Sequence, residues 1–106
     1  MPMSHFTIDE TNRGETVGLQ LGGDLDMSAT FALEPVIDRV LAEQPRELVL
    51  DLGKVPFVDS SGLGLLIATQ ERATRADVGI EITGAGPEIQ RVFQIAGLDG
   101  VLPVRD

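Results

Sequence analysis

Two neighbouring serines, preceded by an acid and followed by a glycine, are the residues best suited to chemistry in this sequence. The segment Asp59-Ser60-Ser61-Gly62 lies between an apolar stretch that predicts a strand and another that predicts a helix. A serine at a helix start is usually a cap, because its hydroxyl accepts a hydrogen bond from an unpaired backbone N–H. One cap accounts for only one of the two serines, so the other hydroxyl is available for a different role.

Phosphorylation is a role that this position suits. The N-terminus of a helix stabilises negative charge, and a phosphate would add about −1.5 to −2 charges beside Asp59. Gly62 has no side chain, so the backbone of another molecule could approach it closely. A phosphorylated serine here would change a docking surface more than it would change the fold.

Serine-based catalysis finds little support in the sequence. A serine hydrolase needs a base near its nucleophile, but the single histidine, His5, lies near the N-terminus. The serines are not in a Gly-x-Ser-x-Gly segment, and Gly62-Leu63-Gly64 lacks the third glycine of a dinucleotide-binding loop. Cysteine is absent, which excludes thiol nucleophiles and Cys–zinc sites. We therefore predict that the chain is not an enzyme and has no catalytic residue.

Carboxylates offer one other possibility, a metal site built from Asp24, Asp26 and Asp51. A receiver domain uses such acids together with a lysine after a late strand. The only lysine is Lys54, which does not follow a late strand. We predict no metal and no cofactor of the chain's own.

Length and charge restrict the remaining classes of function. With 106 residues, the chain has room for a single domain over residues 1–106. Its net charge of −9 disfavours binding to nucleic acid and to anionic lipid. It shows neither an apolar run long enough to cross a membrane nor a signal peptide, which predicts a cytoplasmic protein without a membrane partner.

The order of the predicted elements indicates an α/β fold. Alternating and helical periodicities follow one another along the chain. Strands are predicted at residues 5–9, 16–21, 47–52, 78–82 and, at the edge, 101–104; helices are predicted from near residue 30, from the serine segment to residue 73, and from Pro87 to Gly97. These elements predict a mainly parallel β-sheet with helices packed around it.

The first helix carries a proline that constrains where it begins. Asp26 or Ser28 could cap it, but a proline in a helix interior removes a backbone donor. A start close to residue 30 would place Pro35 in the first turns, and we expect strain or a kink there. The apolar face of this helix is predicted to comprise Phe31, Leu33, Val36, Ile37, Val40 and Leu41.

The sheet is expected to bring two acidic turns together. The strand at residues 47–52 is strongly apolar, which is typical of a central parallel strand covered on both faces. Ligand sites in such folds gather at the carboxyl ends of the strands. Asp26 and the turn at residues 59–62 both follow strands, so they are expected to share one edge.

Three segments resemble the STAS domain family, especially the bacterial anti-sigma-factor antagonists. Residues 51–64, which contain the two serines, resemble the family signature. Leu21-Gly22-Gly23-Asp24-Leu25-Asp26 resembles its glycine-acid-leucine-aspartate turn, and residues 85–98 resemble its last helix. The resemblance spans nearly the whole chain and implies a single STAS-like domain.

The resemblance also implies a mechanism and its residues. An unmodified antagonist binds an anti-sigma factor that is also a serine kinase, and this binding releases the sigma factor. The kinase then uses its own ATP and Mg²⁺ to phosphorylate the first serine, here Ser60, which ends the binding, and a serine phosphatase resets the switch. The resemblance implies a partner-binding surface formed by Asp24, Asp26, Asp59, Ser61, Gly62 and Leu63.

The same fold leaves another kind of function open. STAS domains also serve as adaptor subunits of lipid-transport ATPase complexes, as stress-signalling scaffolds and as tails of anion transporters. Ser60 is compatible with several of these roles, so the residue alone does not distinguish between them.

Overall fold

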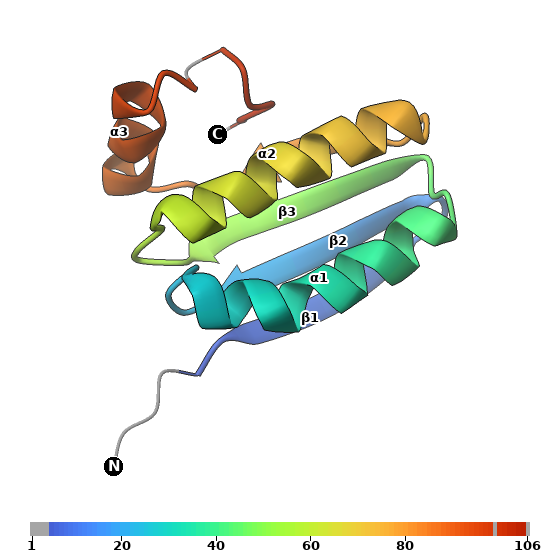
Figure 1. Cartoon of the computed structure of the whole chain (residues 1–106). Helices are drawn as coiled ribbons and strands as arrows, with labels where there is room; N and C mark the ends of the chain where they lie inside the picture. The colour runs from blue at the N-terminus through green and yellow to red at the C-terminus, as the bar shows by residue number, and fades with distance from the viewer. Residues whose placement is uncertain (1–4, 99, 106) are drawn as a thin grey trace.

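The computed structural model describes residues 5–98 and 100–105. Strands and helices alternate after an initial hairpin, as the sequence predicts (Figure 1). The elements are β1 (Thr7–Arg13), β2 (Thr16–Gly22), α1 (Met27–Ala42), β3 (Glu47–Lys54), α2 (Ser60–Arg75), β4 (Gly79–Thr83) and α3 (Pro87–Ile95).

The four strands form one sheet in chain order, β1-β2-β3-β4. Strand β1 pairs antiparallel with β2, whereas β2, β3 and β4 run parallel to one another. Each parallel neighbour is reached through a crossover helix, as parallel pairing requires. The predicted α/β fold, with a mainly parallel sheet and helices packed around it, is confirmed.

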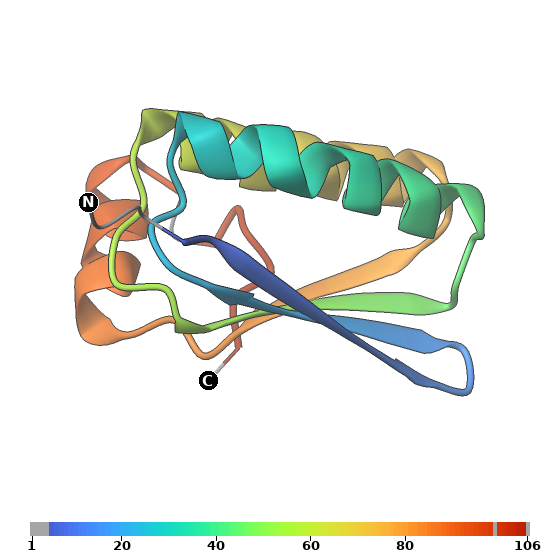
Figure 2. The same ribbon diagram turned by 90° about the horizontal axis from the view of Figure 1, so that it is seen from below.

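Both crossover helices cover the same face of the sheet (Figure 2). Leu48, Leu50 and Leu52 of β3 are buried beneath them, while Glu47 and Asp51 on the other face are only half-buried. The prediction that this strand is covered on both faces is therefore wrong. Strands β2, β3 and β4 are added in one direction across the sheet, so α1 and α2 lie on one side and the opposite face stays open.

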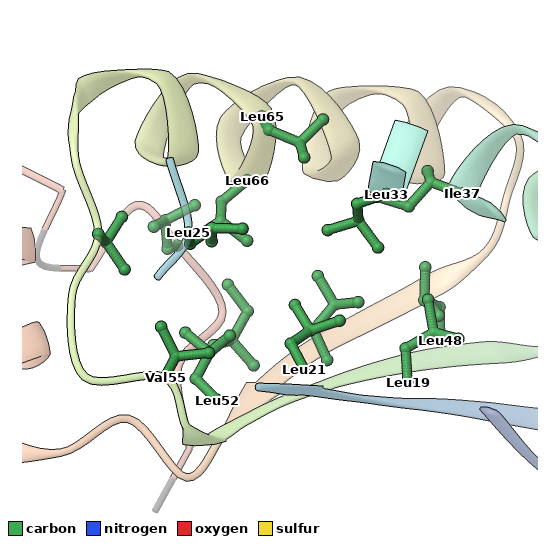
Figure 3. Packing of buried hydrophobic residues seen from close by; sticks show 14 of the residues in the cluster. Leu19, Leu21, Leu25, Leu33, Ile37, Leu48, Leu52, Val55, Leu65 and Leu66 are labelled. Atoms are coloured by element: carbon green, nitrogen blue, oxygen red, sulfur yellow. The ribbon is translucent and has the colours of Figure 1, made fainter. Parts of the chain in front are cut away.

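Leucine side chains fill the space between the sheet and the two crossover helices (Figure 3). Those from the strands point towards those from the helices. Burying one such side chain contributes about 1.5–3 kcal/mol, so this layer determines where α1 and α2 lie. The layer includes Leu19 and Leu21 of β2, Leu48 and Leu52 of β3, Leu33 and Ile37 of α1, and Leu65 and Leu66 of α2.

Helix α1 begins earlier than the sequence predicts. Its N-cap is Asp26 and its first residue is Met27, rather than a residue near 30. Pro35 therefore lies in the helix interior, and the helix is continuous through it. Both Pro35 and Phe31, whose carbonyl would otherwise accept the missing backbone hydrogen bond, are exposed. Water can solvate that carbonyl, which explains why the proline is tolerated.

The two terminal strands also differ from their predicted limits. Strand β1 continues to Arg13, and the turn lies at Gly14, whose φ of 62° favours glycine. Near the C-terminus Val104 makes a single parallel bridge to Ile82, so the predicted strand at residues 101–104 does not form. A proline in that segment removes a backbone donor, which limits the pairing.

Ion pairs connect both flanks of α1 to its neighbours. On one flank Arg39 pairs with Glu10 of β1. On the other flank Asp38 pairs with Arg72 of α2 at 2.7 Å. Exposed pairs such as these add little stability, but they identify which side of α1 faces each neighbour.

Replacing the interior proline tests this description of α1. Proline in a helix interior costs about 3 kcal/mol relative to alanine, and the entropy that it removes from the unfolded chain offsets about 0.4–1 kcal/mol. We expect Pro35→Ala to raise the free energy of unfolding by about 2 kcal/mol. Urea titration followed by far-UV circular dichroism measures it, since the chain has no Trp or Tyr. Glu34→Ala, at the exposed neighbouring position, is the control, and an equal or lower stability of Pro35→Ala would contradict the description.

Candidate functional site

The N-termini of α1 and α2 lie side by side at one edge of the molecule (Figures 1 and 2). Helix α1 follows the carboxyl end of β2, and α2 follows the carboxyl end of β3. The expectation that Asp26 and the serine segment share an edge is therefore confirmed. We call this region, residues 24–27 and 57–62, the helix-start edge.

Asp59, and neither serine, is the N-cap of α2. Its carboxylate Oδ1 accepts a hydrogen bond from the Gly62 N–H at 3.0 Å. Its backbone carbonyl accepts from the Leu63 N–H at 2.9 Å. Ser60 is the first residue of the helix and is exposed. Because Asp59 caps the helix, the Ser60 hydroxyl is not needed for capping.

Asp26 caps α1 in the same way. Its Oδ1 accepts from the Ala29 N–H at 3.0 Å and from the Ser28 hydroxyl at 2.9 Å. The Ala29 hydrogen bond, with a smaller contribution from Ser28, lowers the pKa of the Asp26 carboxyl below its ordinary value. Asp26 is therefore a carboxylate at neutral pH, and it adds negative charge to the edge that carries Ser60.

Backbone hydrogen bonds tie the two helix starts together. The Leu25 N–H donates to the Phe57 carbonyl at 2.9 Å, and the Leu25 carbonyl accepts from the Asp59 N–H at 3.3 Å. These two bonds form a parallel bridge between Leu25 and Val58. The bridge places the residue before the Asp26 cap directly beside the residue before the Asp59 cap.

Gly62 is buried against this bridge. A Cβ at this position would overlap the Leu25 carbonyl oxygen, and it would lie 2.9 Å from Leu25 Cγ and 3.0 Å from Val58 Cγ1. The prediction that Gly62 admits the backbone of another molecule is therefore wrong. The lack of a side chain at Gly62 instead makes room for the backbone of the β2–α1 connection of the same molecule.

The other predicted partner-binding residues lie at the same edge with different exposure. Asp24 is half-buried in the connection between β2 and α1, and Ser61 is half-buried in the first turn of α2. Leu63 is partly buried and packs against the core. The structure brings these residues together with Ser60, while their binding role stays a prediction.

Three carboxylates from the sequence analysis do not form a metal site in the structure. Asp51 Oδ1 accepts from the Gly53 N–H at 2.8 Å and so stabilises the end of β3. Within residues 5–98 and 100–105, no group of three or more His, Cys, Asp or Glu side chains could hold a metal ion. In the same part of the chain, no helix combines the length and the apolar character needed to cross a bilayer.

Two of the exposed apolar side chains at this end of the molecule, Phe31 and Phe57, were not identified from the sequence. Phe31 is exposed, although its spacing assigned it to the apolar face of α1, and Met27 and Phe57 are exposed as well. The position of Phe31 around the helix could have indicated from the sequence that it is exposed. It is two residues before the buried Leu33, which places it about 200° away around the helix.

The chain resembles known proteins over most of its length. A family model described as "Mlab, STAS domain" matches residues 8–103. The anti-sigma-B factor antagonist of Staphylococcus aureus is 28% identical over 102 residues, which cover 96% of this chain and 94% of the relative. The anti-sigma-F factor antagonist RsfB of Mycobacterium tuberculosis is 33% identical over 94 residues, which cover 89% of this chain and 76% of the relative.

A solved structure shows the same arrangement. The crystal structure of an anti-sigma factor antagonist from Mycobacterium paratuberculosis superposes with a TM-score of 0.85 at 32% sequence identity. The match covers 94% of this chain and 85% of that one. The similarity in fold and the similarity in sequence therefore both relate the chain to anti-sigma factor antagonists.

Two glycines of α2 provide a matched test of the contact with Leu25. Gly62→Ala places a methyl group against the Leu25 carbonyl, and we expect overpacking to lower the free energy of unfolding by about 1–3 kcal/mol. At Gly64 a Cβ meets nothing within 4 Å, so we expect Gly64→Ala to be neutral or to gain up to about 1 kcal/mol from helix propensity. Urea denaturation compares the two, and equal effects would contradict the contact.

The lowered pKa of Asp26 predicts a pH dependence of stability. A carboxyl whose pKa is lower in the folded state stabilises the fold above its unfolded pKa of about 3.9, and this stabilisation is lost as the pH falls through the folded value. Asp26→Asn keeps an oxygen that can cap the helix but cannot titrate. We expect the melting temperature of Asp26→Asn to fall less than that of wild type between about pH 6 and about pH 2.

The matched variant for this measurement is Ser28→Ala, which removes only the side-chain hydrogen bond, the smaller of the two contributions to the lowered pKa of Asp26. Its loss of melting temperature over the same pH range should lie between those of wild type and Asp26→Asn. Identical losses in all three proteins would contradict a stabilising role for the Asp26 carboxylate.

Proposed function

The chain belongs to the STAS domain family, and on that basis we propose that it acts as an anti-sigma factor antagonist. In its unmodified form it binds an anti-sigma factor that is also a serine kinase, and the sigma factor is released. The single observation that carries this proposal is the position of Ser60, exposed at the start of α2 and not required as the helix cap.

Phosphorylation of Ser60 by the bound kinase is the proposed off-switch. The ATP and Mg²⁺ belong to the kinase, and the antagonist contributes the hydroxyl and no catalytic group. The first N–H groups of a helix have no partner within it, and they stabilise a nearby anion. Because Asp59 already caps Gly62, a phosphate on Ser60 need not replace any hydrogen bond that holds the helix.

The added charge acts on the docking surface. A phosphoserine carries about −1.5 to −2 charges and would lie beside the carboxylates of Asp59 and Asp26. A partner surface that accommodates the uncharged hydroxyl closely would face both the bulk and the charge of the phosphate. The complex then dissociates, and a serine phosphatase removes the phosphate and restores binding. This cycle places the protein in the cytoplasm, where transcription takes place.

An adaptor role is the second candidate, because the matching family model is described as "Mlab, STAS domain" and not by sigma-factor regulation. In that role the helix-start edge would bind a subunit of a lipid-transport ATPase complex or of a stress-signalling scaffold. The two candidates differ in the partner that is bound and in whether modification of Ser60 controls binding.

Phosphorylation can be tested directly with purified proteins. With the anti-sigma factor of the source organism, ATP and Mg²⁺, we expect wild type and Ser61→Ala to gain one phosphate by intact-mass spectrometry, and Ser60→Ala to gain none. Ser61→Ala is the matched control because it alters the neighbouring hydroxyl. A phosphate on Ser60→Ala would contradict the assignment of Ser60 as the acceptor.

A pull-down from lysate of the source cell distinguishes the two candidate functions. Wild type and Ser60→Ala should capture the kinase and Ser60→Asp should not, while all three should have similar melting temperatures because Ser60 is exposed. Capture of transport-ATPase subunits irrespective of residue 60 would support the adaptor role instead.

A further inference from the structure

Exposed apolar side chains are concentrated near Ser60. Within residues 5–98 and 100–105, five large apolar side chains are exposed, and three of them belong to this end of the molecule. Phe31 is 69% exposed, Met27 59% and Phe57 50%. Phe57 lies in the connection between β3 and α2, and its own carbonyl accepts the hydrogen bond from the Leu25 N–H. Large exposed apolar side chains at one end of a molecule are candidates for contact with a partner.

The ion pairs of α1 show which way Phe31 faces. Asp38 pairs with Arg72 of α2, so the flank of α1 that carries Asp38 faces α2. Phe31 lies seven residues before Asp38, which is close to two full turns, so it occupies the same flank. The opposite flank carries Arg39, which pairs with Glu10 of β1. Phe31 therefore lies on the α2 side of α1, at its outer surface.

Small residues of α2 lie across from Phe31. Arg72 is preceded at helical spacings by Ala68 and Ser61, which place these residues on the α1 side of α2. Ala68 is exposed. At Gly64, which is also exposed, an added Cβ would meet nothing within 4 Å. We call this surface, formed by Met27 and Phe31 of α1 and by Ser61, Gly64 and Ala68 of α2, the helix seam.

Carboxylates outnumber basic side chains around the helix seam, because the arginine on its flank, Arg72, is paired with Asp38. Asp26 and Asp59 cap the two helices at its end, and the exposed Glu34 lies three residues after Phe31 on α1. The whole chain carries a net charge of −9. An aromatic side chain at the centre of an acidic surface complements an apolar pocket with a basic rim, and buried aromatic anchors of this kind carry much of the affinity at protein interfaces.

We propose that the helix seam is the affinity-determining contact with the anti-sigma factor, and that Phe31 inserts into an apolar pocket bordered by basic side chains. This inference rests on the proposed function and adds a division of roles to it. Phe31 provides affinity through apolar burial, whereas Ser60, at the end of the same seam, controls whether the surfaces can meet.

Isothermal titration calorimetry with the purified anti-sigma factor of the source organism tests the inference. We expect Phe31→Ala to raise the Kd about 30-fold or more, which is the effect that defines an interface hot spot, and Phe31→Leu to have a smaller effect. Ile95→Ala is the matched control, since Ile95 is 79% exposed on α3 and outside the helix seam. Its Kd should stay within about twofold of wild type. All three variants should melt close to wild type.

Three results would overturn the inference. The first is an unchanged Kd for Phe31→Ala while Ser60→Asp still weakens binding, which would leave the proposed function intact. The second is equal weakening by Ile95→Ala. The third is that sedimentation finds wild type to be a dimer and Phe31→Ala to be a monomer. The seam would then be an interface between two copies of this chain. By contrast, weakening by Phe31→Ala without any effect of Ser60→Asp would support the seam and contradict the switch.

Discussion

The contact between Gly62 and the Leu25 backbone is the constraint on which the helix-start edge depends. It allows the first turn of α2 to lie directly against the β2–α1 connection, and the bridge between Leu25 and Val58 holds the two segments in register. Both aspartate caps then lie at one edge, and Ser60 becomes the exposed first residue of its helix. A side chain at position 62 would separate these elements without touching Ser60 itself.

Capping by aspartate rather than by serine would keep the fold independent of the proposed regulation at this edge. A serine that held the helix start through its hydroxyl would lose that hydrogen bond on phosphorylation, and the helix would fray. Here Asp59 accepts from the Gly62 N–H, and Asp26 accepts from the Ala29 N–H. A phosphate on Ser60 would therefore leave both capping hydrogen bonds in place, and the core beneath, built from strand and helix leucines, would stay unaltered.

Local sequence signals predict most of this fold and the centre of its site. The alternating strands, the serine segment at the start of α2 and the proline at the start of α3 are confirmed, because each depends on residues next to it in the chain. The errors concern relations between distant segments. Whether β3 is covered on both faces depends on where the helices cross, and whether residues 101–104 form a strand depends on pairing with Ile82. Phe31 was misassigned although its helical phase, about 200° from Leu33, already places it on the outer side of α1. The role of Gly62 depends on Leu25, 37 positions earlier in the chain.

The β1–β2 hairpin lies at the end of the sheet opposite the helix-start edge (Figure 2). Its turn residues, Gly14 and Glu15, are exposed, and the native chain contains no cysteine. A single cysteine placed at Glu15 would thus be the only thiol, and a fluorophore or surface linker attached there would project away from Ser60. The position of the hairpin therefore allows the molecule to be immobilised in one orientation, with the helix-start edge facing the solution.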